Sequence, residues 1–366
     1  MQAWRLSKFF FQALFFRGTL LGNIENCLRF VQSNLKQKTV ETYNTIVTAG
    51  NTGKKIRSEC FVRLELTQTG GIQLNLKSKV IALYEKAIRD LTLDVFRFFD
   101  IQNAKIDIED SGALPWAMAA RIEAAIKQVL KTDKEFLLPM EKHCLYSSAK
   151  ERFRFSRLYL PGNTPNLMIN AGLHGADGII LDLEDAVAPQ KKDEARLLVR
   201  NILRSVNFYG SERMVRINQG QRGIEDLAFV VPHNVHLILV PKCEDASDIQ
   251  LVEEEIDRLR ALNHVNHEIY VMPIIESALG VEKAFEIATS SKHIVALAIG
   301  LEDYTADLGV KRTKEATESL YARTRLVNAC HAAKIQAIDS VFSDVGDMEG
   351  LLQNVKMRKE IGRAHV

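Results

Sequence analysis

Short apolar runs alternate with helical segments through the C-terminal part of the chain, and this alternation constrains the fold more than any other feature. Runs of this kind, bounded by polar residues, are typical of buried parallel strands. The predicted strands are Arg157–Leu160, Gly178–Leu183, Met214–Ile217, His236–Val240, Tyr270–Ile275, Ile294–Gly300 and Ile335–Ile338. The predicted helices are Thr164–Leu173, Lys192–Val206, Asp245–Leu262, Gly280–Thr289, Glu315–Ala333 and Asp347–Lys359. This order predicts an α/β fold with a parallel sheet, which we expect to form a (β/α)8 TIM-type barrel that stops before its last strand.

Acidic residues stand just beyond two successive strands of this predicted sheet. Glu276 follows Tyr270–Ile275, and Asp303 follows Ile294–Gly300 by a few residues. The carboxyl ends of parallel strands in a barrel converge on one mouth, where catalysis takes place in such folds. Two carboxylates at that mouth suit Mg²⁺, which prefers hard oxygen ligands. The alternative is that each acid only begins the loop or caps the helix after its strand.

An arginine and three more acids follow earlier strands. Asp182, Glu184 and Asp185 end or follow the run Gly178–Leu183, and Arg216 lies among apolar residues in the next strand. A buried guanidinium needs an anionic partner, so Arg216 is a candidate clamp for a carboxylate substrate. A structural ion pair with Asp182 or Asp185 is the equally open alternative.

Composition and missing motifs exclude several other classes of protein. No Gly-x-Gly-x-x-Gly or Walker-type loop follows the first strand, which argues against a nucleotide site. The 366 residues carry a net charge of +2, so neither a nucleic-acid partner nor any other polyanion is indicated. The five cysteines form no Cys-x-x-Cys, and no apolar run is long enough to span a bilayer. We therefore expect a cytoplasmic enzyme without membrane association.

Several motifs, in this order, resemble those of the citryl/malyl-thioester lyase family, which includes the beta subunit of citrate lyase. The resemblance extends from about Phe153 to Lys359. The matching motifs are Leu158–Pro165, Leu181–Pro189, Val215–Asn218, Val240–Lys242, Ile275–Val281, Gly300–Gly309 and Ala337–Asp339.

The family resemblance implies a lyase that cleaves a carbon–carbon bond in a 3-hydroxy-3-carboxyacyl thioester. In such enzymes, residues at the positions of Glu276 and Asp303 hold Mg²⁺, and an Arg at the position of Arg216 binds the keto-acid portion. Glu276 is thereby also a substrate-binding candidate. Pro161 and Asn163, at the top of the first strand, resemble the family's contact with the thioester carrier. Three further acids are candidates for orienting the substrate-binding and metal-binding side chains without contacting the substrate themselves: Asp182, Glu184 and Asp185.

Residues 41–131 predict a separate small α+β domain. Strand Ser58–Leu66 is expected to pair with Ile72–Leu76 across the Gly70–Gly71 turn, with a third strand at Ala104–Ile108. Helices are predicted over Val80–Phe99, which has a core-facing apolar stripe, and over Trp116–Leu130. This unit resembles the gamma-type acyl carrier of citrate lyase. The resemblance implies a phosphoribosyl-dephospho-coenzyme-A arm, a phosphopantetheine-like prosthetic group, on Ser58; the alternative is that Ser58 only opens a strand.

The expected domain layout combines these two resemblances. Residues 1–40 form an unassigned basic and aromatic leader, 132–150 a linker that serves as a hinge, 151–360 the incomplete barrel, and 361–366 a non-native tail, because that segment back-translates to a common sequencing adapter.

We expect this chain to act on a citryl thioester held by its own carrier domain, as a homo-oligomer together with the alpha (transferase) subunit of citrate lyase. The alternatives are a malyl- or citramalyl-coenzyme-A-type lyase that acts on free thioesters, and a non-catalytic carrier or scaffold subunit.

Overall fold

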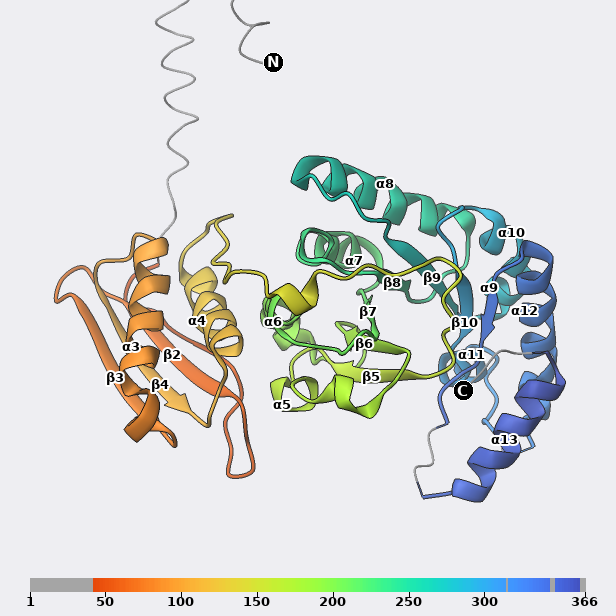
Figure 1. Cartoon of the computed structure of the whole chain (residues 1–366), viewed down its shortest axis with the longest axis horizontal. Helices are drawn as coiled ribbons and strands as arrows, with labels where there is room; N and C mark the ends of the chain where they lie inside the picture. The colour runs from red at the N-terminus through yellow and green to blue at the C-terminus, as the bar shows by residue number, and fades with distance from the viewer. Residues whose placement is uncertain (1–41, 314, 343–345, 363–366) are drawn as a thin grey trace, which may run out of the picture.

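The computed structural model describes residues 42–313, 315–342 and 346–362, which form two domains packed side by side (Figure 1). The predicted leader and residues 363–366 of the predicted tail lie outside the described residues. Within the described ranges, no helix is both long and apolar enough to cross a membrane.

The N-terminal domain is a four-stranded sheet with two helices. Its strands lie in the order β1-β2-β4-β3, with β2 antiparallel to β1 and β4, and β3 parallel to β4. One face of β2 and β4 is buried, and the other face is more exposed. The elements are β1 (Ile46–Ala49), β2 (Cys60–Leu66), β3 (Ile72–Ser78), α3 (Ile81–Phe98), β4 (Ala104–Asp110) and α4 (Pro115–Val129).

The predicted hairpin between the second and third strands is wrong. Strand β4 lies between β2 and β3, so those two strands do not pair across Gly70–Gly71. The reason is burial: β4 places Ala104, Ile106 and Ile108 on the core with at most 1% exposure, as a central strand can. Strand β3 buries little of its alternating polar sequence and therefore takes the edge.

The C-terminal domain is a curled, parallel, seven-stranded sheet with helices outside it (Figure 1). The strands are β5 (Arg157–Pro161), β6 (Gly178–Asp182), β7 (Glu212–Arg216), β8 (Leu237–Val240), β9 (Tyr270–Ile275), β10 (Ala296–Ile299) and β11 (Gln336–Ile338), and they pair in sequence order. All seven overlap the predicted strands. The helices are α5 (Pro165–Met168), α6 (Lys192–Ser205), α7 (Gly220–Leu227), α8 (Ala246–Asn263), α9 (Ala278–Glu282), α10 (Ala284–Thr289), α11 (Leu301–Asp307), α12 (Leu320–Ala333) and α13 (Met348–Glu360). The sequence did not predict α7 and α11, which are short.

The curl of the sheet brings its two edge strands together at their amino ends. Gln336 in β11 donates a hydrogen bond of 2.8 Å to the Arg152 carbonyl and accepts one of 3.1 Å from the Arg154 amide, just before β5. The strands therefore follow a barrel-like curve, and their carboxyl ends face the same side.

The segment predicted as a hinge, 132–150, is hydrogen-bonded to the C-terminal domain at several points. Arg204 in α6 donates from Nε to the Leu138 carbonyl over 2.9 Å. Further along, the Tyr146 hydroxyl donates to the Ser211 carbonyl over 2.6 Å, and Ser148 donates to Glu212 over 2.5 Å. In this structure the segment is held along α6 and the start of β7, and it does not have the form of a free tether.

Candidate active site

The first three strands of the C-terminal domain end at one level. Pro161 pairs in register with Asp182, and Asp182 pairs with Arg216. The amide of Gly162 donates to the Asp182 carbonyl over 2.7 Å, so the loop after β5 begins directly at this level. The predicted residues at the ends of β5, β6 and β7 are thus brought together.

Arg216 is bound by the acids that the sequence placed near it. Its Nε and Nη2 donate to the two carboxylate oxygens of Asp182 over 2.7 and 2.6 Å. Its Nη1 lies 2.9 Å from Glu184 and 3.5 Å from Asp185, and the guanidinium lies over the ring of Tyr159. Burial alone would lower the pKa of Arg216, but the bonds to Asp182 outweigh it and raise that pKa. Arg216 is thus ion-paired with Asp182, and Nη1 is the nitrogen that faces the other acids; the predicted role of Arg216 as a substrate clamp stays a prediction.

Glu276 lies just beyond β9 and is 6% exposed. One of its oxygens accepts the backbone N–H of Lys242 over 3.0 Å. A Cβ at Gly300 would stand only 2.2 Å from the other oxygen, so a glycine is required there to leave room for the carboxylate. Burial, with the nearby charges of Asp303 and Glu184, raises the pKa of Glu276 to about 7.

Lys242 connects the two carboxylates predicted as metal ligands. Its ammonium lies 3.3 Å from Asp303 in α11, while its backbone N–H binds Glu276. Lys242 also has a left-handed backbone with φ of +47°, which is uncommon for a residue with a side chain. Sequence reasoning did not select Lys242 as a site residue. Its position two residues after β8 was the signal, because the carboxyl ends of the strands in such a sheet face the same mouth.

Glu276 and Asp303 fit the requirements of Mg²⁺. Burial and the negative charge of Asp303 raise the pKa of Glu276, so a cation beside these carboxylates is favoured. Among the residues that the structure describes, no group of three or more His, Cys, Asp or Glu forms a complete metal cage. Mg²⁺ does not need one, since it is commonly held by one or two carboxylates with water and substrate oxygens.

Asn163 lies at the boundary between the two domains, and Ser58 precedes Glu59, which binds the same arginine as Asn163. The side-chain oxygen of Asn163 accepts from Arg121 of the N-terminal domain over 2.7 Å. Ser58 is half-buried, lies two residues before β2 rather than in it, and has φ of +55°. Its backbone N–H donates to the Ser111 carbonyl over 3.0 Å. The roles predicted for Asn163 and Ser58 stay predictions.

Comparison with known proteins gives matches for both domains. Residues 156–364 match the family profile described as HpcH/HpaI aldolase/citrate lyase. Residues 47–129 match the acyl-carrier-type profile described as malonate decarboxylase delta subunit (MdcD).

Individual relatives match the C-terminal domain. The citrate lyase subunit beta of Leuconostoc mesenteroides subsp. cremoris is 37% identical over 219 residues, which cover 58% of this chain and 71% of the relative. Human mitochondrial citramalyl-CoA lyase is 29% identical over 232 residues, covering 59% of this chain and 68% of the relative. A solved structure of a citrate lyase beta subunit from Mycobacterium tuberculosis, complexed with oxaloacetate and magnesium, is 25% identical and covers 59% of this chain and 91% of its own, with a TM-score of 0.47.

Proposed function

Because the chain belongs to the HpcH/HpaI aldolase/citrate lyase family and is an oxo-acid lyase, we propose a specific reaction for it. In this reaction, which requires Mg²⁺, the protein cleaves a citryl thioester to an acetyl thioester and oxaloacetate. The single observation that carries the proposal is the placement of Glu276 and Asp303 around Lys242 at the carboxyl end of the sheet. We further propose that the complete fold of this domain is a (β/α)8 barrel.

Glu276 and Asp303 would hold the metal ion. When bound, Mg²⁺ supplies a Lewis acid that polarises the oxygens of the departing keto acid. The burial of Glu276 shields its carboxylate from bulk water, and Lys242 balances the charge of Asp303 before the metal binds.

Arg216 would bind the keto-acid carboxylate through Nη1. Its Nε and Nη2 are already fixed by Asp182, which orients the guanidinium plane toward Glu184. Burial raises the pKa of Glu184, so this acid takes up a proton more readily than an exposed glutamate. A neutral Glu184 would leave the charge of Nη1 to the substrate.

The reaction itself is a retro-aldol cleavage. The hydroxyl of the citryl group gives its proton to a base as its carbon–oxygen bond becomes a carbonyl. The adjacent carbon–carbon bond breaks, and its electron pair moves into the enolate of the acetyl thioester, which then takes a proton at carbon. The enolate needs electrostatic stabilisation while it forms.

The N-terminal domain favours a carrier-bound substrate over free thioester. It matches an acyl-carrier-type profile, and a tethered thioester has a high effective concentration at the site. We propose that Ser58 carries the phosphoribosyl-dephospho-coenzyme-A arm, and that a homo-oligomer of this chain works with a citrate lyase alpha subunit. The similarity to citramalyl-CoA lyase supports a second candidate, a lyase for free coenzyme-A thioesters.

The substitution Asp303→Asn tests the proposed site. We expect it to abolish oxaloacetate release from citryl-coenzyme A and to weaken Mg²⁺ binding measured by calorimetry. Asp307→Asn is the matched control, because Asp307 lies one turn further on α11 and only accepts the Ala278 amide, over 2.8 Å, a bond that asparagine keeps. Wild-type activity and Mg²⁺ affinity in Asp303→Asn would remove Asp303 from the site.

A further inference from the structure

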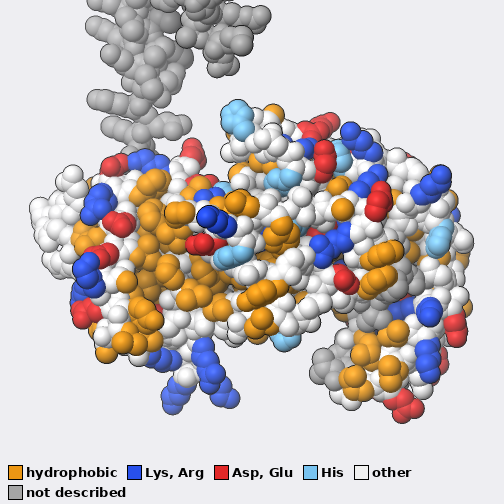
Figure 2. Space-filling view, in the orientation of Figure 1, with side chains coloured by type: hydrophobic (Ala, Val, Ile, Leu, Met, Phe, Trp, Pro, Cys, Tyr) orange, Lys and Arg blue, Asp and Glu red, His pale blue; other side chains and the backbone are white. Residues whose placement is uncertain are grey.

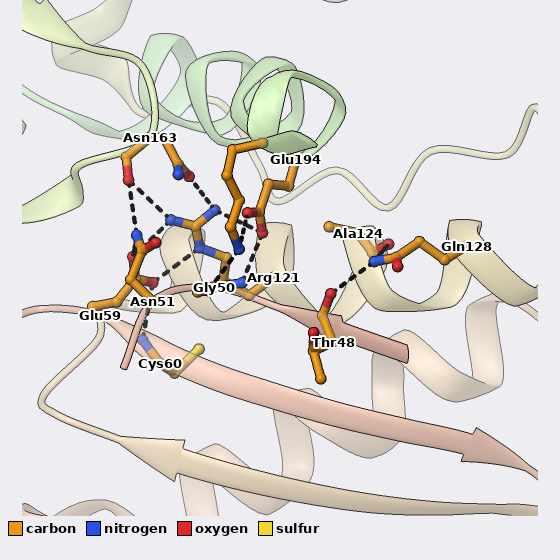
Figure 3. Close-up of polar contacts among 11 residues, drawn as sticks. Thr48, Gly50, Asn51, Glu59, Cys60, Arg121, Ala124, Gln128, Asn163 and Glu194 are labelled. Atoms are coloured by element: carbon orange, nitrogen blue, oxygen red, sulfur yellow. Dashed lines mark hydrogen bonds and ion pairs between the residues drawn. The ribbon is translucent and has the colours of Figure 1, made fainter. Parts of the chain in front are cut away.

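Arg121, at the centre of α4, connects the two domains through a buried polar cluster (Figure 3). Its side chain is fully buried. Within its own domain it donates from Nε and Nη2 to the two oxygens of Glu59 over 2.9 and 2.6 Å. Its third nitrogen, Nη1, faces the other domain, so all three guanidinium nitrogens have partners.

Across the boundary, Arg121 binds the loop after β5 and helix α6. Nη1 donates to the side-chain oxygen of Asn163 over 2.7 Å, and Nη2 donates to the Asn163 carbonyl over 3.2 Å. Nη1 also lies 3.2 Å from Glu194 in α6. Asn51 donates to the same Asn163 carbonyl over 3.1 Å, so both the side chain and the backbone of Asn163 are held from the N-terminal domain.

A second connection lies beside the first. The amide of Gly50 donates to Glu194 over 2.7 Å, and Lys191 donates to the Gly50 carbonyl over 2.9 Å. Gly50 is buried and has φ of +88°, and a Cβ there would stand 2.0 Å from the Cys60 carbonyl. The packing against Cys60 fixes Gly50 within its own domain, and the bonds to Glu194 and Lys191 then tie this fixed backbone to the other domain, so a shift of the domains at Gly50 breaks them.

We propose that the N-terminal domain works from a fixed position on the C-terminal domain, and that Arg121 is the positioning residue that sets this position and holds Asn163 at the mouth of the site. The domain is then a permanent wall of the mouth and does not travel as a mobile carrier. Ser58 directly precedes Glu59, so it is held at the same corner. If Ser58 bears the arm, as the proposed function has it, only the arm moves.

Hydrogen exchange at the Gly50 amide tests the fixed position without any activity measurement. Its acceptor is the Glu194 side chain of the other domain, so lasting protection of this amide requires that the two domains stay in contact at Gly50. We expect peptides that contain Gly50 to exchange at least about 100-fold more slowly than the exposed turn at 68–70, both in the free enzyme and during turnover of citryl-coenzyme A with Mg²⁺. Exchange as fast as that turn would overturn the fixed position. An inactive chain with a protected Gly50 refutes the proposed function but supports this inference.

The substitution Arg121→Gln tests the positioning role. We expect loss of the protection at Gly50 by more than about tenfold, a rise in KM for citryl-coenzyme A, and a kcat within about threefold of wild type. Arg200→Gln is the matched control, because Arg200 is also buried at the domain boundary but contacts Glu123, Glu135 and Phe136 rather than Asn163. It should leave KM unchanged.

Two outcomes would overturn the positioning role. One is an Arg121→Gln protein with wild-type KM and Gly50 protection. The other is an equal rise of KM in both variants, which would mean that any weakening of the boundary has the same effect. If Arg121→Gln does not fold, Glu194→Gln removes the charge that faces Arg121 and Gly50, and the same measurements decide the question.

Discussion

Replacing Arg200 by methionine should separate the stabilities of the two domains. Arg200 in α6 and Glu123 in α4 are both fully buried, and they form a bidentate ion pair with N–O distances of 3.0 and 2.6 Å. Removing one partner leaves a buried charge with only a more distant and partly exposed counter-charge, Lys127 for Glu123 or Glu135 for Arg200, so the cost should lie at the lower end of the typical range of about 3–5 kcal/mol. Replacing both by apolar residues of similar volume costs far less, because no charge stays buried.

The assay is urea unfolding followed by the fluorescence of Trp116, which begins α4 and is 5% exposed. A Trp4→Phe background removes the only other tryptophan. We expect the Trp116 midpoint to fall by about 1–2 M urea in Arg200→Met and in Glu123→Met. The double variant should regain most of this loss, to within about 2 kcal/mol of the parent. Arg97→Met is the control, since Arg97 pairs with Asp94 in an exposed bridge that should contribute at most about 1 kcal/mol.

Additive losses would refute this reasoning. If the double variant is as unstable as the sum of the two single variants, Arg200 and Glu123 are not coupled, and the boundary between α4 and α6 is not held by this pair. Far-ultraviolet circular dichroism reports mainly on the larger C-terminal domain. In the parent it should show the same midpoint as Trp116, whereas in Arg200→Met the Trp116 transition should come first.

Three further predictions concern the site, the carrier serine and pH. Arg216→Lys keeps the charge but loses the planar fork that binds Asp182, so KM for citryl-coenzyme A should rise; unchanged kinetics would leave Arg216 without a substrate role. Ser58→Ala should abolish arm attachment, measured by mass spectrometry, and activity on citrate with the partner subunit, but keep activity on citryl-coenzyme A; full activity on citrate would exclude Ser58. Burial lowers the pKa of His236 from 6.5 to about 3, so the unfolded chain binds a proton that the folded chain does not. The contribution of His236 to the free energy of unfolding is fully present above pH 6.5 and decreases below it by about 1.4 kcal/mol per pH unit. When the free energy of unfolding is measured at decreasing pH, His236→Gln should show a weaker dependence on pH than the parent.

The strands of the C-terminal domain could be predicted because each one is a local signal. Strands β6, β8, β9 and β10 are buried along their whole length, so their apolar runs identify them without reference to distant partners. The ends of these strands then predicted which residues share the mouth, and Asp182 and Arg216 do meet there. Lys242 lies in a matching motif after β8, but its contacts were not predicted because they depend on a left-handed backbone and on a hydrogen bond to Glu276 after the next strand.

Pairing in the N-terminal domain could not be predicted in the same way. The Gly70–Gly71 turn favours a hairpin locally, but the competition for the central position of the sheet is decided by Ile106 and Ile108, which lie far along the chain. A Gly-Gly turn predicts only that the chain reverses direction there, and it does not predict whether the two strands that flank it pair with each other.

Helix α4 did carry a sign of the domain boundary in its sequence. Its apolar and alanine-rich surface continues around the helix, and a helix of that kind is buried on more than one side. Within that surface stand Arg121 and Glu123, which have no exposed fraction and each pair across the boundary. Apolar residues would not require one particular alignment of the two helices, whereas we expect the two charges to favour the alignment that pairs both of them. The sequence of α4 thus contains the two charged residues that determine how the domains dock, but their partners Glu194 and Arg200 can be identified only from the folded structure.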